Sequence, residues 1–172
     1  TAQRRSLGRN GYRDDWGFAA EPTALPSSTG YGARMQAGAT DRYLYLYIEV
    51  DDAGFDPEPG NVHLERDRFD RIDLTLEQAD GAQESYFFGT NAPGLIGAQK
   101  TVKDDRGPAR AVEEPRIQAF WLQTSAGYTA GARLPVRLLA TRLCVAHRHG
   151  ARVASQRCPI LRPGYLYYSE CI

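Results

Sequence analysis

At every second position of one segment the chain carries a side chain with both apolar and polar parts: Tyr43, Tyr45, Tyr47 and Glu49. Tyrosine rings offer flat apolar faces with polar tips, and a carboxylate accepts hydrogen bonds from hydroxyl groups. This combination suits a carbohydrate-like or other small polar ligand, and it predicts that Tyr47→Ala would weaken binding while leaving the fold intact. The alternatives are an outer sheet face with tyrosine pairs across strands and a surface covered by a second packed layer.

Two other segments carry residues that could complete such a ligand site. Arg71 and Asp73 alternate with aliphatic residues and would add polar groups if their strand lay beside the tyrosine strand. Trp121 could clamp a sugar ring. It shares a strand face with Ile117 and Ala119, however, which favours burial instead.

No cofactor is expected, although calcium remains open. Asp51 and Asp52 begin an oxygen-rich segment, and calcium takes about six to eight oxygen ligands. Aspartate near glycine also simply makes turns, and no spaced acidic calcium loop is present. A haem-carrying domain would need axial ligands, for which Met35 with one of the three histidines is the Met/His choice.

The sequence gives little support for catalysis. His63, His147 and His149 are scattered, and a Gly-x-Ser-x-Gly nucleophile motif is absent. Two carboxylates that cleave a glycosidic bond are recognised by their separation in space, which the sequence does not give. We therefore expect a chain that is not an enzyme.

Composition excludes some partners. The chain of 172 residues has 21 Lys plus Arg and 21 Asp plus Glu, a formal net charge of zero. A neutral chain is a poor match for nucleic acid, whose binding is dominated by phosphate neutralisation. No apolar run approaches the roughly 20 residues that span a bilayer, so membrane contact is expected only through segments outside this sequence. Because the sequence starts at Thr1 and Met35 is its one methionine, we expect a processed protein or a domain of a larger one.

The three cysteines predict at most one disulfide bond. Cys144 lies in an apolar run and is interpreted as a small buried hydrophobic residue. Cys158 and Cys171 flank a Pro-Gly segment and are the predicted pair if the compartment is oxidising.

The elements that would position these residues are short strands. Strict alternation predicts strands over 43–50 and 71–77, with six residues in the core: Leu44, Leu46, Ile48, Ile72, Leu74 and Leu76. Further strands are predicted over 85–89, 117–123 and 128–135, with a last hairpin around Gly150. We interpret 20–40 as loop with at most a short strand, 91–115 as a long irregular segment, and 136–143 as a short helical turn. This pattern favours an all-β, two-sheet antiparallel sandwich of the jelly-roll or immunoglobulin-like kind, with long loops.

Several motifs occur in an order that resembles the family nine carbohydrate-binding-module-like domains, which share the DOMON-type β-sandwich. They are the Asn10–Trp16 opening, the Tyr43–Asp52 strand, the Phe69–Leu76 strand and the Gly127–Pro135 hairpin. The resemblance implies a β-sandwich that binds a carbohydrate-like ligand. The chain departs from the pattern at Gly131, where the family often carries glutamate.

The N-terminal arginine pair and the closing Gly164–Ser169 segment add a second resemblance, to the extracytoplasmic region of certain proteobacterial membrane histidine kinases. It implies a periplasmic sensor domain whose kinase module lies outside this chain. We expect one domain over 1–172, with a core of about 11–155 and a C-terminal extension over 156–172. The alternative function is a protein–protein interaction domain, in which the tyrosine face joins a second copy or another chain.

Overall fold

The computed structural model describes residues 22–25, 32–40, 42–52, 70–77, 80–89, 94–102, 110–135, 142–149, 152–162 and 165–169. Within these ranges every regular element is a β-strand. In chain order the strands are β1 (Thr23–Leu25), β2 (Gly32–Ala39), β3 (Tyr43–Asp51), β4 (Arg71–Glu77), β5 (Gln83–Gly89), β6 (Gly94–Val102), β7 (Arg110–Gln123), β8 (Gly127–Pro135), β9 (Arg142–His149), β10 (Arg152–Arg162) and β11 (Tyr165–Ser169). None of the described segments is a helix long and apolar enough to cross a bilayer.

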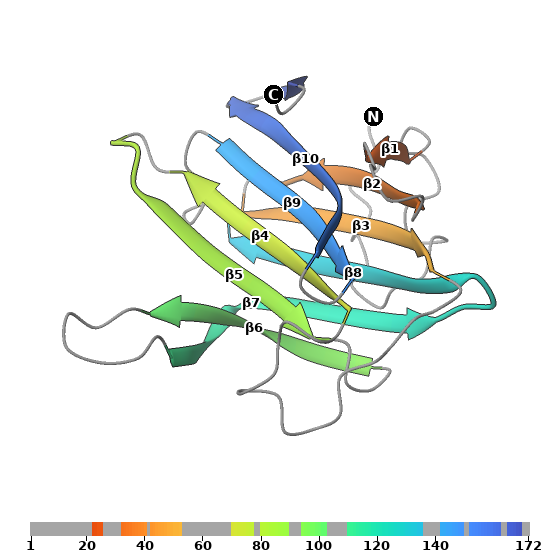
Figure 1. The fold of residues 1–172 in the computed structure, drawn as a ribbon. Coiled ribbons are helices and arrows are strands. Elements are labelled where there is room, and N and C mark those ends of the chain that lie inside the picture. The colour runs from red at the N-terminus through yellow and green to blue at the C-terminus, as the bar shows by residue number, and fades with distance from the viewer. Residues whose placement is uncertain are drawn as a thin grey trace.

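The strands form one antiparallel sheet that curls into two layers. Their order is β1-β2-β3-β8-β7-β6-β5-β4-β9-β10-β11. Figure 1 shows β5, β4, β9 and β10 crossing over β2, β3, β8 and β7. At the turn between the layers, the described residues of β5 and β6 pair at Tyr86 with Lys100 and at Phe87 with Gln99. The predicted all-β sandwich is confirmed.

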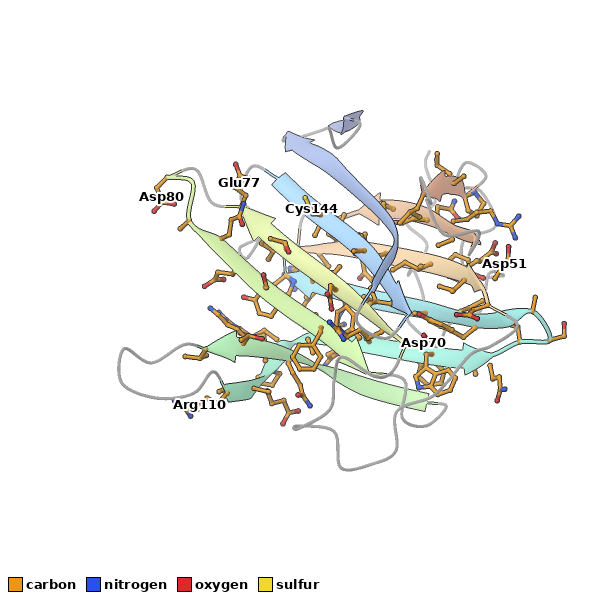
Figure 2. All side chains as sticks on the ribbon, viewed as in Figure 1. Asp51, Asp70, Glu77, Asp80, Arg110 and Cys144 are labelled. Carbon is orange, nitrogen blue, oxygen red and sulfur yellow. The ribbon has the colours of Figure 1, made fainter. Side chains whose placement is uncertain are left out.

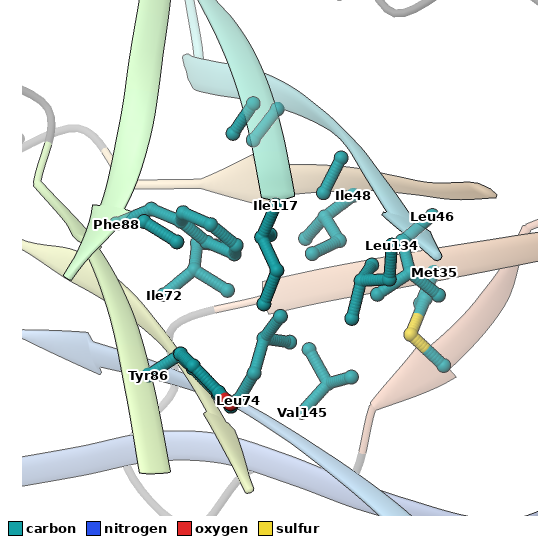
Figure 3. Packing of buried hydrophobic residues seen from close by; sticks show 14 of the residues in the cluster. Met35, Leu46, Ile48, Ile72, Leu74, Tyr86, Phe88, Ile117, Leu134 and Val145 are labelled. Carbon is teal, nitrogen blue, oxygen red and sulfur yellow. The ribbon is translucent and has the colours of Figure 1, made fainter. Parts of the chain in front are cut away.

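The hydrophobic core lies between the two layers (Figure 3). All six predicted core residues are at most 1% exposed. They are joined by residues from the other strands, among them Met35, Tyr86, Phe88, Ile117, Leu134 and Val145. Because strand side chains alternate between faces, each strand that contributes here presents its remaining residues on the outside of the sandwich.

The structure differs from the sequence interpretation in several segments, and one of these lies mostly outside the described residues. Residues 32–39 form a full strand, β2, which pairs with β3 along its whole length. The segment 91–115 contains β6 and the start of β7, which pair with each other. The predicted helical turn over 136–143 lies mostly outside the described residues, and its last two residues belong to β9. The predicted C-terminal extension carries the end of β10 and all of β11.

Glycine closes two hairpin turns. In the β4–β5 hairpin, Gly81 has φ +84° and the Ala82 amide donates to Asp80 Oδ1 at 2.9 Å. In the β7–β8 hairpin, a Cβ on Gly127 would lie 2.2 Å from the Val50 carbonyl oxygen. That spacing leaves room for glycine alone, because β8 runs directly beside the end of β3 there.

Candidate functional site

The tyrosine face lies on the outside of the layer formed by β2, β3, β8 and β7. Leu44, Leu46, Ile48 and Val50 are in the core, so the alternate residues of β3 face away from it. Across the sheet Tyr45 pairs with Arg133 of β8, and Arg133 pairs with Gln118 of β7. Arg133 and Gln118 were not predicted as site residues.

Part of this outer face is closed. Tyr47 is only 2% exposed, and its hydroxyl donates to Oε1 of Glu49 at 3.2 Å. Glu49 also forms an ion pair with Arg34 of β2 at 3.3 Å. Tyr47 is therefore not positioned as an open ligand contact, and the prediction that it stacks on a ligand is replaced by a packing role. The predicted ligand role of the half-buried Glu49 stays a prediction.

The other part is open, and we name it the tyrosine–arginine cluster: Tyr43, Tyr45, Arg133 and Gln118. All four are half-buried. The Arg133 guanidinium carbon lies 4.5 Å from the centroid of the Tyr43 ring, and the Tyr43 and Tyr45 rings meet edge to face at 6.2 Å. Nη2 of Arg133 donates to Oε1 of Gln118 at 2.6 Å. These contacts place the guanidinium between the Tyr43 ring and the Gln118 amide.

Several polar atoms of this cluster have no protein partner. Among the described residues, no hydrogen bond involves the hydroxyl of Tyr43 or Tyr45. Nε of Arg133 also has no partner among them, but this atom is buried and is not offered to a ligand on the surface. A surface that combines flat ring edges with unused donors and acceptors is suited to a polyhydroxylated ligand.

Arg71 and Asp73 do not join this cluster. They lie on β4, which pairs with β5 and β9 in the other layer, while β3 pairs with β2 and β8. Nε of Arg71 forms an ion pair with Oδ1 of Asp73 at 2.9 Å, and Arg71 is 6% exposed. The sequence interpretation that placed them beside the tyrosines is wrong.

Trp121 is a core residue and not a ligand clamp. It is 1% exposed and meets Tyr128 edge to face at 6.3 Å between ring centroids. Trp16, in the predicted opening motif, lies outside the described residues.

The predicted metal and haem ligands are separated or buried. Asp51 is exposed and pairs with Arg34 at 3.6 Å, whereas Asp52 is 2% exposed and its amide donates to the Ala126 carbonyl at 2.7 Å. Within the described part of the chain, no three His, Cys, Asp or Glu side chains gather to hold a metal ion. Met35 packs in the core at 1% exposure, which speaks against its use as a haem ligand.

A buried acidic region lies at one end of the sandwich. Asp70 is 1% exposed and Asp52 is 2% exposed, and Asp70 is labelled in Figure 2 at the start of β4. Complete burial raises the pKa of Tyr128 well above its usual value, and the negative charges of Asp70 and Asp52 add to the rise. Tyr128 therefore stays neutral throughout the physiological pH range.

A second charged group lies where β5, β6 and β7 meet. Glu84 accepts hydrogen bonds from Lys100 and, at 2.7 Å, from the Tyr86 hydroxyl; these bonds lower the pKa of Glu84. Glu114 is bound by Arg116 in the same way, and its pKa is also lowered. Each acid has a basic partner, Lys100 for Glu84 and Arg116 for Glu114, so the charges of this group neutralise one another.

Cys144 is disulfide-bonded and half-buried on β9 (Figure 2). The chain has three cysteines, so its partner is Cys158 or Cys171. The predicted pair Cys158–Cys171 is therefore wrong, as is the interpretation of Cys144 as a simple buried hydrophobic residue.

Solved structures of similar fold include carbohydrate-binding modules. A family 9 carbohydrate-binding module from Caldicellulosiruptor kristjanssonii in complex with cellotriose superposes with a TM-score of 0.58 at 16% identity, covering 90% of this chain and 78% of the module. This chain has the fold of a family 9 carbohydrate-binding module. The same kind of module in complex with glucose gives a TM-score of 0.54 at 15% identity, covering 88% and 80%. No protein-family model matches the sequence, and no curated protein matches it.

Proposed function

We propose that the chain is a non-catalytic carbohydrate-binding domain and that the tyrosine–arginine cluster is its ligand site. The observation that carries the proposal is the geometry of Arg133, held between the Tyr43 ring and Gln118 beside the open ring of Tyr45. The family 9 modules that share this fold hold cellotriose and glucose, which supports a sugar ligand here.

Each residue of the cluster has a part in this proposal. The ring of Tyr45 supplies the apolar surface against which the C–H face of a sugar stacks. Arg133 and the Gln118 amide donate hydrogen bonds to ring or hydroxyl oxygens. The three strands that carry Tyr45, Arg133 and Gln118 span about 10 Å, which is enough for one or two sugar rings.

The wider setting is also a proposal: the domain is the extracytoplasmic sensor part of a membrane protein, in our interpretation a histidine kinase. A disulfide bond at Cys144 supports an oxidising compartment such as the periplasm. The sensor setting itself rests on the sequence resemblance. It is tested by asking whether sugar addition changes autophosphorylation of the full-length protein.

Titration of the chain with glucose and cellotriose tests the binding site directly. Tyr45→Ala should weaken binding by about 1–2 kcal/mol, the effect of losing an aromatic anchor, with little change in melting temperature. Val112→Ala, which trims an exposed apolar residue at the far end of β7, is the matched control and should bind like wild type. Unchanged binding by Tyr45→Ala would reject this site.

The same variant distinguishes the rival function. If no sugar binds and Tyr45→Ala converts a dimer into a monomer in analytical ultracentrifugation, the tyrosine face is a protein interface instead.

A further inference from the structure

We infer that the ligand of the tyrosine–arginine cluster carries a negative charge, and that the preferred sugar is one whose ring bears a carboxylate, a uronate. The inference rests on the proposed function and names the chemical class of its ligand. It comes from the charge balance around Arg133.

Within the part of the chain that the structure describes, Arg133 is a cation without a counter-ion. No carboxylate of the described residues forms an ion pair with it. The other members of the cluster, two tyrosines and a glutamine, are neutral. The cluster therefore carries a net positive charge in a half-buried position, where a charge is costly unless it is paired.

Two acids on neighbouring strands, Glu49 of β3 and Glu113 of β7, have other positions or partners. Glu49 pairs with Arg34 and accepts a hydrogen bond from Tyr47. Glu113 is exposed and reaches over Gly97 on β6, where its Oε1 lies 3.2 Å from the position that a Cβ would take. In the described structure neither acid approaches Arg133 closely enough to form an ion pair.

Apart from the bond from Nη2 to Gln118, the guanidinium forms no hydrogen bond within the described residues, and Nε is buried. Nη2 is directed by Gln118, and the Tyr43 ring lies 4.5 Å from the guanidinium carbon. These two contacts restrain the guanidinium. A planar fork is the geometry that matches a carboxylate with two parallel hydrogen bonds, which a neutral hydroxyl cannot offer.

The other charged groups of the protein differ in this respect. Arg34, Arg71, Lys100 and Arg116 each have an acidic partner within 4 Å. Arg133 differs from these four residues. It is half-buried, its guanidinium lies over the Tyr43 ring, and no described carboxylate pairs with it. This contrast is what selects it as an anion contact and not as part of the charge pairs that stabilise the fold.

Two pairs of probes test the charge preference by isothermal titration: glucuronate with glucose, and trigalacturonate with its methyl ester. We expect the acid of each pair to bind about tenfold or more tightly than its neutral partner, the gain typical of a charge-assisted hydrogen bond. Arg133→Gln should abolish that advantage. Arg34→Gln is the matched control, because it also removes one positive charge. Arg34 pairs with Glu49, four residues after Tyr45 on β3, and this variant should keep the preference for the acids.

The outcomes separate the two levels of the proposal. Neutral sugars bound as tightly as the acids would overturn the inference and leave the proposed function standing. Binding of none of the four probes, nor of cellotriose, would reject the proposed function itself. An acid preference that survives Arg133→Gln would also overturn the assignment to Arg133.

A folding defect in Arg133→Gln would not leave the question open. The acid preference of the wild-type chain should then shrink as salt rises from about 0.05 to 0.5 M, because screening weakens an ion pair more than a neutral contact. A preference that is constant over this range would contradict the inference.

Discussion

The hydroxyl of Tyr47 donates to Glu49 two residues along the same strand, at 3.2 Å, while the ring of Tyr47 is only 2% exposed. Tyr47→Ala should therefore unfold the chain more easily, with a loss of about 3 kcal/mol, typical of truncating a buried aromatic residue. Chemical denaturation measures it. Tyr47→Phe keeps the ring and should cost only about 1 kcal/mol, the value of one hydrogen bond. An unchanged midpoint in Tyr47→Ala would return Tyr47 to the list of ligand contacts.

The turn between β7 and β8 predicts a strict requirement for glycine. A Cβ on Gly127 would lie 2.2 Å from the Val50 carbonyl oxygen and 2.7 Å from the Asp52 amide nitrogen, both backbone atoms. Gly127→Ala should therefore destabilise the chain by at least about 2 kcal/mol. Gly81→Ala is the matched control: Gly81 also has a positive φ, but nothing lies within 4 Å of its Cβ position, so only backbone strain of roughly 1 kcal/mol is expected. Equal melting temperatures for the two variants would disprove the clash.

The disulfide bond of Cys144 has a predicted partner. The β9–β10 ladder passes through Val145 with Arg157 and Arg142 with Ile160, which places the backbone of Cys158 opposite Cys144. Directly paired strand residues have Cα separations of about 4.5–5.5 Å, within the range of a disulfide bond. Peptide mapping without reductant should recover Cys144 linked to Cys158 and Cys171 as a free thiol. A Cys144–Cys171 peptide would show that this register argument fails.

Reduction of that bond should lower stability. A closed loop of about 15 residues contributes roughly 3 kcal/mol in the chain-entropy model. Denaturation with and without a reducing agent measures the loss. Cys144→Ser should reproduce the reduced protein, whereas Cys171→Ser should behave like the oxidised wild type.

Acid should weaken the contact between β5, β6 and β7. The pKa values of Glu84 and Glu114 are lowered by hydrogen bonds from Lys100 and Arg116. A lowered pKa means that the charged form stabilises the folded state above the unfolded value of about 4.3, and that this stabilisation is lost as pH falls below it. Melting temperature should thus drop between about pH 5 and pH 3, and less steeply in a Glu84→Gln, Glu114→Gln double variant. Parallel curves for the two proteins would contradict this.

The sequence predicted the faces of the strands better than their order. The alternation of β3 and β4 is strict, so Leu44 and Leu74 could be assigned to the core from the pattern alone. The expectation that Arg71 lies beside the tyrosines failed because it treated strands that follow each other in the sequence as neighbours. In the sheet, β8 takes that position beside β3.

This order explains why Arg133 and Gln118 were missed. Both sit on strands that were predicted, and both alternate with core residues such as Ile117 and Leu134. Their proximity to Tyr45 depends on the register of β3 with β8 and of β8 with β7, which no local pattern encodes.

The sequence interpretation missed β2 and the first half of β7 for local reasons. β2 consists largely of small residues, Gly-Ala-Arg-Met-Gln-Ala-Gly-Ala, which favour loops in a sequence interpretation. β7 contains Pro115, which argues against a strand because proline lacks an amide hydrogen. The structure tolerates it because the β6–β7 ladder shifts register between Gly97 and Ala98, where their partners pass from Gln118 to Glu114.

The long ladder between β3 and β8 also bears on how the chain folds. Nine residue pairs join these strands, although β4, β5, β6 and β7 separate them in the sequence. Pairings between distant segments require a large loop to close before any contact compensates for the lost entropy, and sandwiches of this kind fold in milliseconds to seconds. Because Tyr45 and Arg133 stand on opposite sides of that ladder, the tyrosine–arginine cluster is assembled only once β3 and β8 have paired, and a partly folded chain cannot present it.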